Sequence, residues 1–249
     1  MACPTLFVLA GFLLVGPVGC VDGVARRLSA ERSAPALLPD AASQPLAAAG
    51  PKRGVLRQEQ LWNTYYWMTR EEDFGPGDDV ALYDSDCDEM ATVSQEFFET
   101  ICVEGSGMLL SGELLNWADT CDCGDSCPAH GLTVCYTELD TDDYPWGAGT
   151  DSSQLEPLVS WAVGEDFYQG TVFFVEQIEG VAVPLVDDIG GFVHDGCFRA
   201  DDVGVGVEGD HFDFFAGTHG MFKVWETLFP TNTYFTVHID DPRCDYLTR

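Results

Sequence analysis

Basic residues are scarce in this chain of 249 residues. It contains 11 Lys and Arg against 42 Asp and Glu, which gives a formal net charge of −31 at pH 7. Six of the bases, with only three acids, lie between Val21 and Arg57, so the rest of the chain carries 39 acids and five bases. A domain this acidic repels the phosphate groups of nucleic acids. Nucleic acid is therefore excluded as a partner.

The chain also lacks a hydrophobic run long enough to span a bilayer. The apolar run from Leu6 to Val15 is too short for a membrane helix but has the length of a secretory signal core. We predict a signal peptide over residues 1–20 and an extracytoplasmic location, in the periplasm or outer membrane. Cys20 follows Val18-Gly19 as in a bacterial lipoprotein cleavage box, with Pro17 in place of the usual Leu. A lipid on Cys20 would be the only link to a membrane, and a plain cleaved signal is the alternative.

Residues 21–55 lack sustained periodicity and are rich in Ala, Pro and Ser, which predicts a flexible tether. A folded domain is predicted over residues 56–249. Helices are predicted in ATVSQEFFETIC, with Thr92 and Gln95 as a capping box, and in THGMFKVWETLFP. The remaining segments resemble short strands, including a hairpin that turns at Ser111-Gly112, and their number favours a barrel or sandwich.

Cysteine usage supports export. Without Cys3 and Cys20, eight of the ten cysteines remain, which allows four disulfides whose pairing the sequence does not determine. The run CDCGDSC also suggests zinc, but its spacing is not that of a paired Cys-x-x-Cys site and no histidine cluster accompanies it. Disulfides are therefore favoured, and no metal or cofactor is predicted. The eight cysteines are Cys87, Cys102, Cys121, Cys123, Cys127, Cys135, Cys197 and Cys244.

Carboxylates gather in a glycine-rich stretch near the C-terminus. Asp202-Val203-Gly204 is followed by GDHFDFFAG, so that Asp213 lies eleven residues after Asp202. This spacing resembles that of the three-aspartate (3D) domain, and most closely the C-terminal part of the membrane-bound lytic transglycosylase A family. Upstream, Ser160 to Glu176 resembles a strand pair of the same family, with Gly170-Thr171 in the matching place.

The resemblance implies a mainly β fold, a six-stranded double-psi β-barrel with one or two short helices. It covers residues 158–239 and 61–67, and leaves a cysteine-rich insertion at about residues 77–146. It also implies glycan strands of peptidoglycan as partner, and we expect a monomer. Three positions depart from the family pattern: Val205 replaces a Gly, Glu208 replaces a frequent Lys, and Gly164 occupies the place of the first Asp, with Asp166 two residues further on.

Asp213 has the surroundings expected of a general acid. Phenylalanines flank it, Asp202 and Asp210 are expected nearby, and both influences raise the pKa of a carboxyl group. The resemblance then implies a lytic transglycosylase that cleaves the MurNAc-GlcNAc bond to a 1,6-anhydro product, with Asp202 orienting Asp213 or stabilising positive charge. Asp166, Gly204, His211 and Asp210 are predicted as supporting residues.

Two other functions fit the same residues. One is a non-catalytic barrel of expansin-like type, which holds cell-wall glycan while Asp202 and Asp213 only cap turns. The other is a glycoside hydrolase with Asp213 as acid and Asp202 or Asp166 as base. Aromatic residues of the first strand, Tyr65, Tyr66 and Trp67, could stack on sugar rings, although alternation turns Tyr66 to the face opposite the other two. The insertion is the segment available to form a second wall of a glycan groove.

Overall fold

The computed structural model describes residues 57–77 and 79–248, which belong to one compact unit of the chain, Pro51–Arg249. The predicted signal peptide, the lipid site at Cys20 and the tether lie outside the described residues. Among the described helices, none has the length and hydrophobicity needed to cross a membrane.

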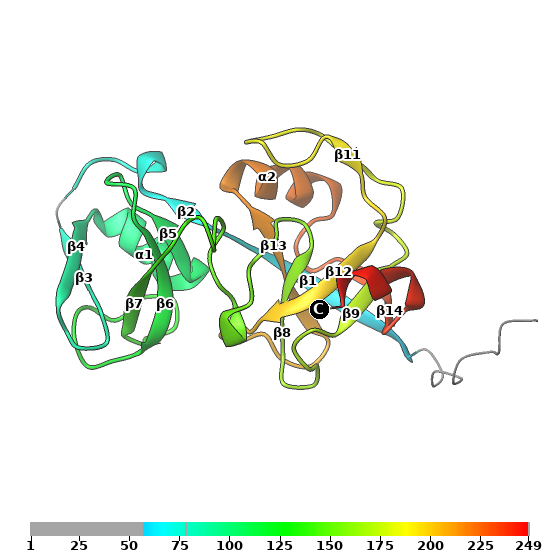
Figure 1. Ribbon diagram of the computed structural model, residues 1–249, viewed down its shortest axis with the longest axis horizontal. Helices are drawn as coiled ribbons and strands as arrows, with labels where there is room; N and C mark the ends of the chain where they lie inside the picture. Colours follow the sequence, from blue (N-terminus) through cyan, green and yellow to red (C-terminus); the bar gives the residue numbers. More distant parts are fainter. Residues whose placement is uncertain (1–56, 78, 249) are drawn as a thin grey trace, which may run out of the picture. The chain divides into compact units, whose positions relative to one another are not determined.

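Six strands close into a barrel, which confirms the predicted mainly β fold (Figure 1). Two of the neighbouring pairs, β1 with β13 and β12 with β8, are parallel, and the other pairs are antiparallel. In order around the barrel, the strands are β1 (Arg57–Trp67), β13 (His211–Gly217), β8 (Ser160–Val163), β12 (Cys197–Asp202), β9 (Val172–Val175) and β14 (Tyr234–Ile239).

Aromatic side chains fill the barrel core. Trp161 is fully buried and stacks on Phe212, with ring centroids 3.8 Å apart. Helix α2 (His219–Leu228) packs against β13 and β1 and begins where the Thr218 hydroxyl accepts a hydrogen bond from the Met221 amide, 3.1 Å away. Met221 and Trp225 are buried in the barrel core, whereas Leu228 is 45% exposed and lies off the core-facing side.

Strand register brings the two aspartates of the motif together. Asp202 on β12 and Asp213 on β13 both have Ala162 of β8 as their cross-strand partner. Cross-strand partners project from the same face of a sheet. The eleven-residue spacing therefore places both carboxyl groups on one face, on either side of a small side chain.

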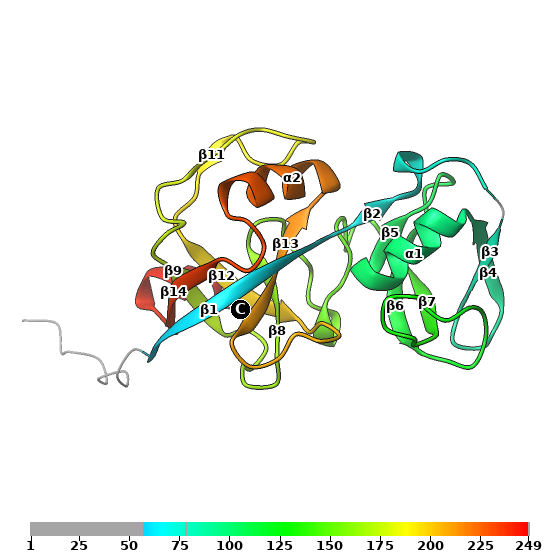
Figure 2. The same cartoon turned by 180° about the vertical axis from the view of Figure 1, so that it is seen from behind.

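Between β1 and β8 the chain forms a second β-sheet with helix α1 (Gln95–Glu104). Strand β1 leads directly into β2 (Thr69–Arg70), the first strand of this sheet, as Figures 1 and 2 show. The predicted hairpin at Ser111-Gly112 is confirmed, because it joins β5 (Ser106–Met108) to β6 (Leu114–Thr120). The other strands here are β7 (Val134–Leu139) and the separate pair β3 (Val80–Tyr83) and β4 (Glu89–Val93).

The predicted cap of α1 is wrong. Thr92 still belongs to strand β4, and Ser94 caps the helix by accepting a hydrogen bond from the Phe97 amide, 3.3 Å away. The small elements that complete the described fold are β10 (Ala182–Val183), β11 (Phe192–Val193) and three 3₁₀ helices at Glu71–Asp73, Thr150–Ser152 and Pro242–Leu247.

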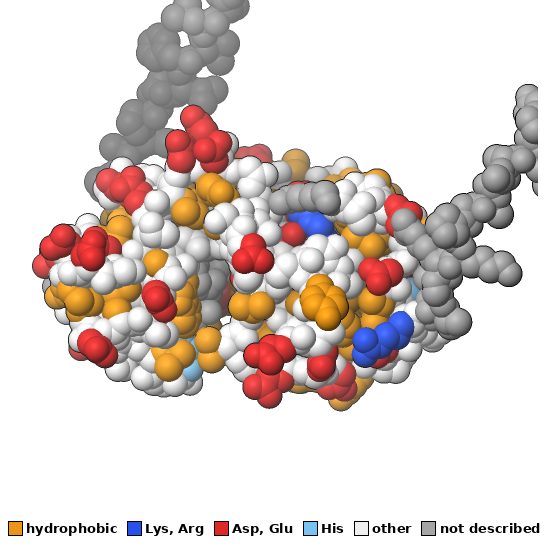
Figure 3. Space-filling model, turned by 60° about the horizontal axis from the view of Figure 1, so that its bottom comes forward, with side chains coloured by type: hydrophobic (Ala, Val, Ile, Leu, Met, Phe, Trp, Pro, Cys, Tyr) orange, Lys and Arg blue, Asp and Glu red, His pale blue; other side chains and the backbone are white. Residues whose placement is uncertain are grey.

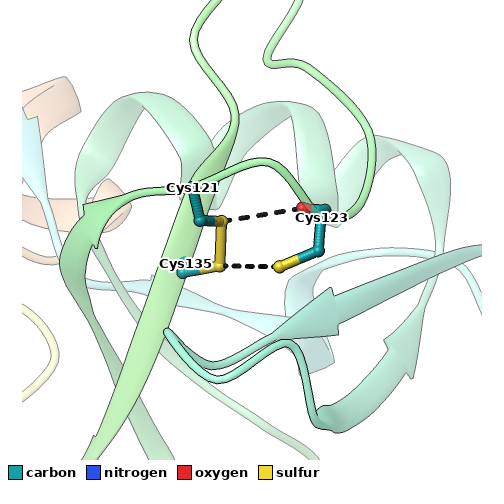
Figure 4. Close-up of side chains that lie close together, drawn as sticks. All are labelled: Cys121, Cys123 and Cys135. Atoms are coloured by element: carbon teal, nitrogen blue, oxygen red, sulfur yellow. Dashed lines mark hydrogen bonds between the residues drawn. A yellow bond between two sulfur atoms is a disulfide. The ribbon is translucent and has the colours of Figure 1, made fainter.

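All eight cysteines of the folded part form disulfides, which confirms the prediction. Three of the pairs lie in the insertion and one joins β12 to the C-terminal 3₁₀ helix. Figure 4 shows the side chain of Cys123 beside the Cys121–Cys135 disulfide, with Cys123 Sγ 3.5 Å from Cys135 Sγ. The sulfurs of Cys121, Cys123 and Cys135 lie within 4.8 Å of one another, but a disulfide sulfur has no thiolate to offer a metal. The pairs are Cys87–Cys123, Cys102–Cys127, Cys121–Cys135 and Cys197–Cys244.

Candidate functional site

A cleft of about 600 Å³ is lined by residues of both the barrel and the insertion. The barrel contributes Asp213 and the segment from Asp202 to Val205, and the insertion contributes residues of α1 and β6. Among the residues that the structure describes, the lining contains no Lys or Arg. Over the face drawn in Figure 3, acidic side chains are scattered and basic ones are sparse. The cleft therefore holds carboxyl groups without a permanent positive charge to neutralise them.

Asp213, the third residue of β13, lines the cleft. Its Oδ1 atom is 2.8 Å from Thr64 Oγ1 on the neighbouring strand. The pKa of Asp213 is raised to about 7. Burial is the main cause and the negative charge of Asp202 adds to it, while hydrogen bonds from the Thr64 hydroxyl and the Phe214 amide lower the pKa. A carboxyl group with a pKa near neutrality can both donate and accept a proton.

Asp202 is the second carboxyl group of the cleft. The Val203 amide donates to its Oδ1 atom at 2.9 Å, and the Thr150 hydroxyl lies 3.4 Å from the same atom. Burial nevertheless raises the pKa of Asp202 to about 7. Since the two aspartates repel each other, the first proton to leave makes the second harder to remove.

His211 reaches Asp213 indirectly, through Thr64. Its Nε2 atom lies 2.8 Å from Thr64 Oγ1, and its Nδ1 atom lies 3.3 Å from the carbonyl oxygen of Gly206. The ring is 7% exposed and stacks on Trp62 with centroids 3.7 Å apart. Burial lowers the pKa of His211, so the ring is neutral at pH 7.

Glu104 is a cleft residue that sequence reasoning missed. It is the last residue of α1, and its Oε2 atom accepts a hydrogen bond from the Trp67 amide at 2.9 Å. Burial raises its pKa well above the usual range, and the charge of Asp213 adds to this. A glutamate at a helix C-terminus is electrostatically unfavourable. That unfavourable position, directly before Gly105, is the one signal in the sequence that could have drawn attention to it.

The aromatic residues of β1 divide between two faces, as alternation predicts. Tyr66 lines the cleft, whereas Tyr65 donates a hydrogen bond to the Phe229 carbonyl at 2.6 Å and Trp67 stacks on Phe222 of α2. Of the three aromatic residues predicted to stack on sugar rings, Tyr66 is therefore the one that lines the cleft. Its buried hydroxyl makes no hydrogen bond of normal geometry within the described part of the chain. Burial raises its pKa well above the usual range, and Asp202 is the charged neighbour with the largest effect.

The other predicted site residues do not all reach this cleft. Gly204 lines it, and a Cβ atom at that position would come within 2.5 Å of Val207 Cγ2. Asp166 and Asp210 lie together in a separate hollow beside Arg57. The structure thus brings Asp202, Gly204 and Asp213 together but not Asp166 or Asp210.

Gly164 stands where the family pattern has its first Asp. A Cβ atom there would lie 3.0 Å from the Val207 carbonyl oxygen and 3.1 Å from the Glu208 Cα atom. The backbone of the following loop packs directly on this glycine, so a side chain at this position would require that loop to shift.

Comparison with known proteins places the fold. No family model and no curated protein matches the sequence. The structure is similar to a crystal structure of Escherichia coli MltA with bound chitohexaose, with a TM-score of 0.50 and 14% identity over 72% of this chain and 71% of that chain.

Weaker matches include a membrane-bound lytic murein transglycosylase from Agrobacterium tumefaciens, with a TM-score of 0.43 and 14% identity over 61% of this chain and 51% of that chain. MltA from Neisseria gonorrhoeae matches with a TM-score of 0.42 and 12% identity over 61% of this chain and 47% of that chain. The protein thus has a fold like that of the MltA lytic transglycosylases. The resemblance seen in the sequence is confirmed at the level of the fold.

Proposed function

We propose that the protein is a peptidoglycan lytic transglycosylase in which Asp213 is both general acid and general base. The observation that carries this proposal is the pair of cleft carboxyl groups, Asp202 and Asp213, whose pKa values are raised to about 7. The described residues of the lining around them include no Lys or Arg. An enzyme that must donate and then recover one proton at neutral pH needs such a group.

In this mechanism, Asp213 first gives its proton to the oxygen of the MurNAc-GlcNAc bond as the bond from the anomeric carbon breaks. Positive charge then develops on the sugar ring, and the carboxylates of the cleft stabilise it. The 6-hydroxyl of the same sugar attacks the anomeric carbon and loses its proton to Asp213. The product is a 1,6-anhydro sugar, and no water molecule is consumed.

The comparisons support a glycan as substrate. The E. coli MltA structure is of a complex with chitohexaose, a neutral glycan. By analogy, glycan strands would lie in the cleft with Tyr66 and the insertion as their contacts. We also propose, from the sequence, an extracytoplasmic location with a lipid anchor on Cys20, consistent with a relative described as membrane-bound.

The test is to incubate the oxidised protein with peptidoglycan sacculi and to identify the soluble products by mass spectrometry. We expect anhydro-muropeptides from the wild type and none from Asp213→Asn. Asp210→Asn is a matched control, because Asp210 lies in the same stretch but outside the cleft. The proposal is wrong if Asp213→Asn retains the activity, or if sacculi bind the wild-type protein and are not cleaved, which would favour the expansin-like barrel.

A two-carboxylate hydrolase is the second candidate, and the structure favours one version of it. Asp202 shares the cleft with Asp213, whereas Asp166 lies in the separate hollow, so Asp202 would be the base. A hydrolase would release products with a free reducing end in place of the anhydro ring. The same mass spectra therefore distinguish the two reactions.

A further inference from the structure

The lining of the cleft offers a ligand no permanent positive charge from the residues that the structure describes. Four of its side chains carry carboxyl groups, those of Glu104, Asp151, Asp202 and Asp213. The five described Lys and Arg residues lie outside this lining, and all but Lys223 form ion pairs with Asp or Glu. An anion that enters the cleft therefore loses its water without gaining a cation. The five bases are Arg57, Arg70, Arg199, Lys223 and Arg243.

His130 is the one lining residue in the described part of the chain that could become a cation, and its hydrogen bonds are those of a neutral ring. Its Nε2 atom lies 2.9 Å from the carbonyl oxygen of Cys102, which can only accept, so Nε2 carries a proton. Its Nδ1 atom accepts a hydrogen bond from the Leu132 amide at 3.2 Å, so Nδ1 carries none. In this arrangement His130 adds no positive charge to the cleft.

The C-terminal end of helix α1 also lines the cleft. The last two residues of the helix, Val103 and Glu104, and the cap residue Gly105 all belong to the lining. Aligned peptide dipoles give the C-terminal end of a helix a partial negative charge. The backbone of α1 therefore adds to the negative potential that the carboxyl groups create.

Exposed apolar side chains occur on both walls of the cleft. Val103 of α1 is 51% exposed, and Val203 and Val205, which follow β12, are 55% and 58% exposed. Trp117 of β6 adds a half-buried ring, and such rings stack on the apolar faces of sugars. The Tyr66 hydroxyl, which lacks a partner of normal geometry among the described residues, is an uncharged donor. The lining thus suits a ligand with hydroxyl groups and apolar faces but no negative charge.

We propose that the cleft selects glycans whose bound sugars carry no free carboxylate, and that it discriminates against the free lactyl carboxylate of MurNAc. This selectivity rests on the proposed function, because it requires a glycan in the cleft. In peptidoglycan the lactyl group is joined to a stem peptide by an amide bond and is itself uncharged. Hydrolysis of that amide bond releases the carboxylate, so strands stripped of their peptides become poor ligands. The protein therefore acts on a strand before an amidase does.

The test compares two six-sugar strands of alternating GlcNAc and MurNAc. One strand keeps its free lactyl carboxylates, and in the other each carboxylate is converted to a primary amide, which has nearly the same size. Calorimetry with Asp213→Asn at pH 8 avoids cleavage and leaves the other three carboxyl groups of the cleft in place. We expect the amide strand to bind about tenfold more tightly at about 20 mM salt, and this ratio to fall at about 300 mM salt.

Two further variants, each made in the Asp213→Asn background, separate the cleft from the net charge of the protein. Val205→Lys adds a cation to the lining, and Val193→Lys adds the same charge on β11, at a position that is 65% exposed and outside the lining. We expect Val205→Lys to reduce the preference for the amide strand about threefold and Val193→Lys to leave it unchanged. An equal reduction in both variants overturns the proposal, since net charge alone would then explain the preference.

The outcomes distinguish this selectivity from the proposed function. Equal affinities for the two strands, or tighter binding of the carboxylate strand, overturn the selectivity and leave a glycan-binding cleft. A preference for the amide strand that does not change with salt also overturns it, because the cause would then be fit and not charge. If neither strand binds, both the selectivity and the proposed function are wrong.

Discussion

Strand β12 carries two adjacent aspartates with opposite surroundings. Asp201 is 2% exposed and bonded to Arg199 Nε at 2.6 Å and Nη2 at 2.9 Å, with the Ser160 hydroxyl as a further donor. Asp202 turns to the other side of the strand and lines the cleft, where the part of the chain that the structure describes places no Lys or Arg. Burial raises the pKa of Asp202 to about 7.

The comparison shows that the number of acids does not mark a functional site. The stretch from His194 to Gly217 has six Asp and Glu residues but a single base, Arg199. Arg199 is already paired with other acids, because its Nη2 atom donates both to Asp201 and, at 3.0 Å, to Glu156 Oε1. The acids left without it are the ones that face the cleft or solvent. Pairing with Arg199 therefore distinguishes Asp201 from the acids that line the cleft.

Removing one carboxylate at a time tests whether Asp201 and Asp202 contribute differently to the free energy of unfolding. Asp201→Asn leaves the buried Arg199 without its main partner, and we expect the free energy of unfolding to fall by about 3 kcal/mol. Asp202→Asn removes a carboxyl group without a cation and should cost less than about 1 kcal/mol at pH 7. Urea unfolding at pH 7 measures both. Equal losses in the two variants would contradict the division of β12 into a structural and a functional side.

The pH dependence of stability provides a smaller effect. Because the pKa values of Asp202 and Asp213 are raised in the folded protein, the folded state holds protons that the unfolded state releases between about pH 4 and pH 7. The stabilisation is present below the unfolded pKa values and is lost as pH rises through about 7.

The double variant Asp202→Asn/Asp213→Asn should not lose stability as pH rises, because it has neither carboxyl group. We expect its free energy of unfolding to equal that of the wild type at pH 4 and to be about 2 kcal/mol higher at pH 8. The expected difference is this small because both carboxyl groups face the cleft, where solvent screens them. Urea unfolding across this pH range would show the difference. A wild type that is the more stable of the two at pH 8 would contradict the raised pKa values.

The smallest effect is expected for Glu104, on the affinity for chitohexaose. As a protonated acid it donates a hydrogen bond as an amide does, so Glu104→Gln should preserve the affinity for chitohexaose. Glu104→Ala should weaken it threefold to tenfold, corresponding to about 1 kcal/mol for one hydrogen bond. Calorimetry in an Asp213→Asn background avoids cleavage of the ligand. Loss of affinity in Glu104→Gln equal to that in Glu104→Ala would indicate that the carboxylate form is required.

The sequence was sufficient to predict what depends on local spacing. Periodicity predicts helix α2 and a barrel or sandwich, the family resemblance implies the six-stranded barrel, and the motif predicts that Asp202 lies near Asp213. Residues whose roles arise from tertiary contact were not predictable. Glu104 gains its position only when the insertion packs beside the barrel, and Asp166 is directed away from the cleft although it lies close to the motif pattern in sequence. Thr92 was wrongly chosen as a cap because strand β4 extends through it.

The pairing of the insertion cysteines has a consequence for how the protein is made. Cys87 pairs with Cys123 across Cys102 and Cys121, and Cys102 pairs with Cys127 across Cys121 and Cys123. A chain that is oxidised as it emerges from a translocon joins neighbouring cysteines first, and none of the three insertion pairs joins neighbours. Correct pairing therefore requires early disulfides to be exchanged for later ones, a slow process without a catalyst. A host with an active disulfide isomerase should give a far higher yield of protein with this cleft than one without.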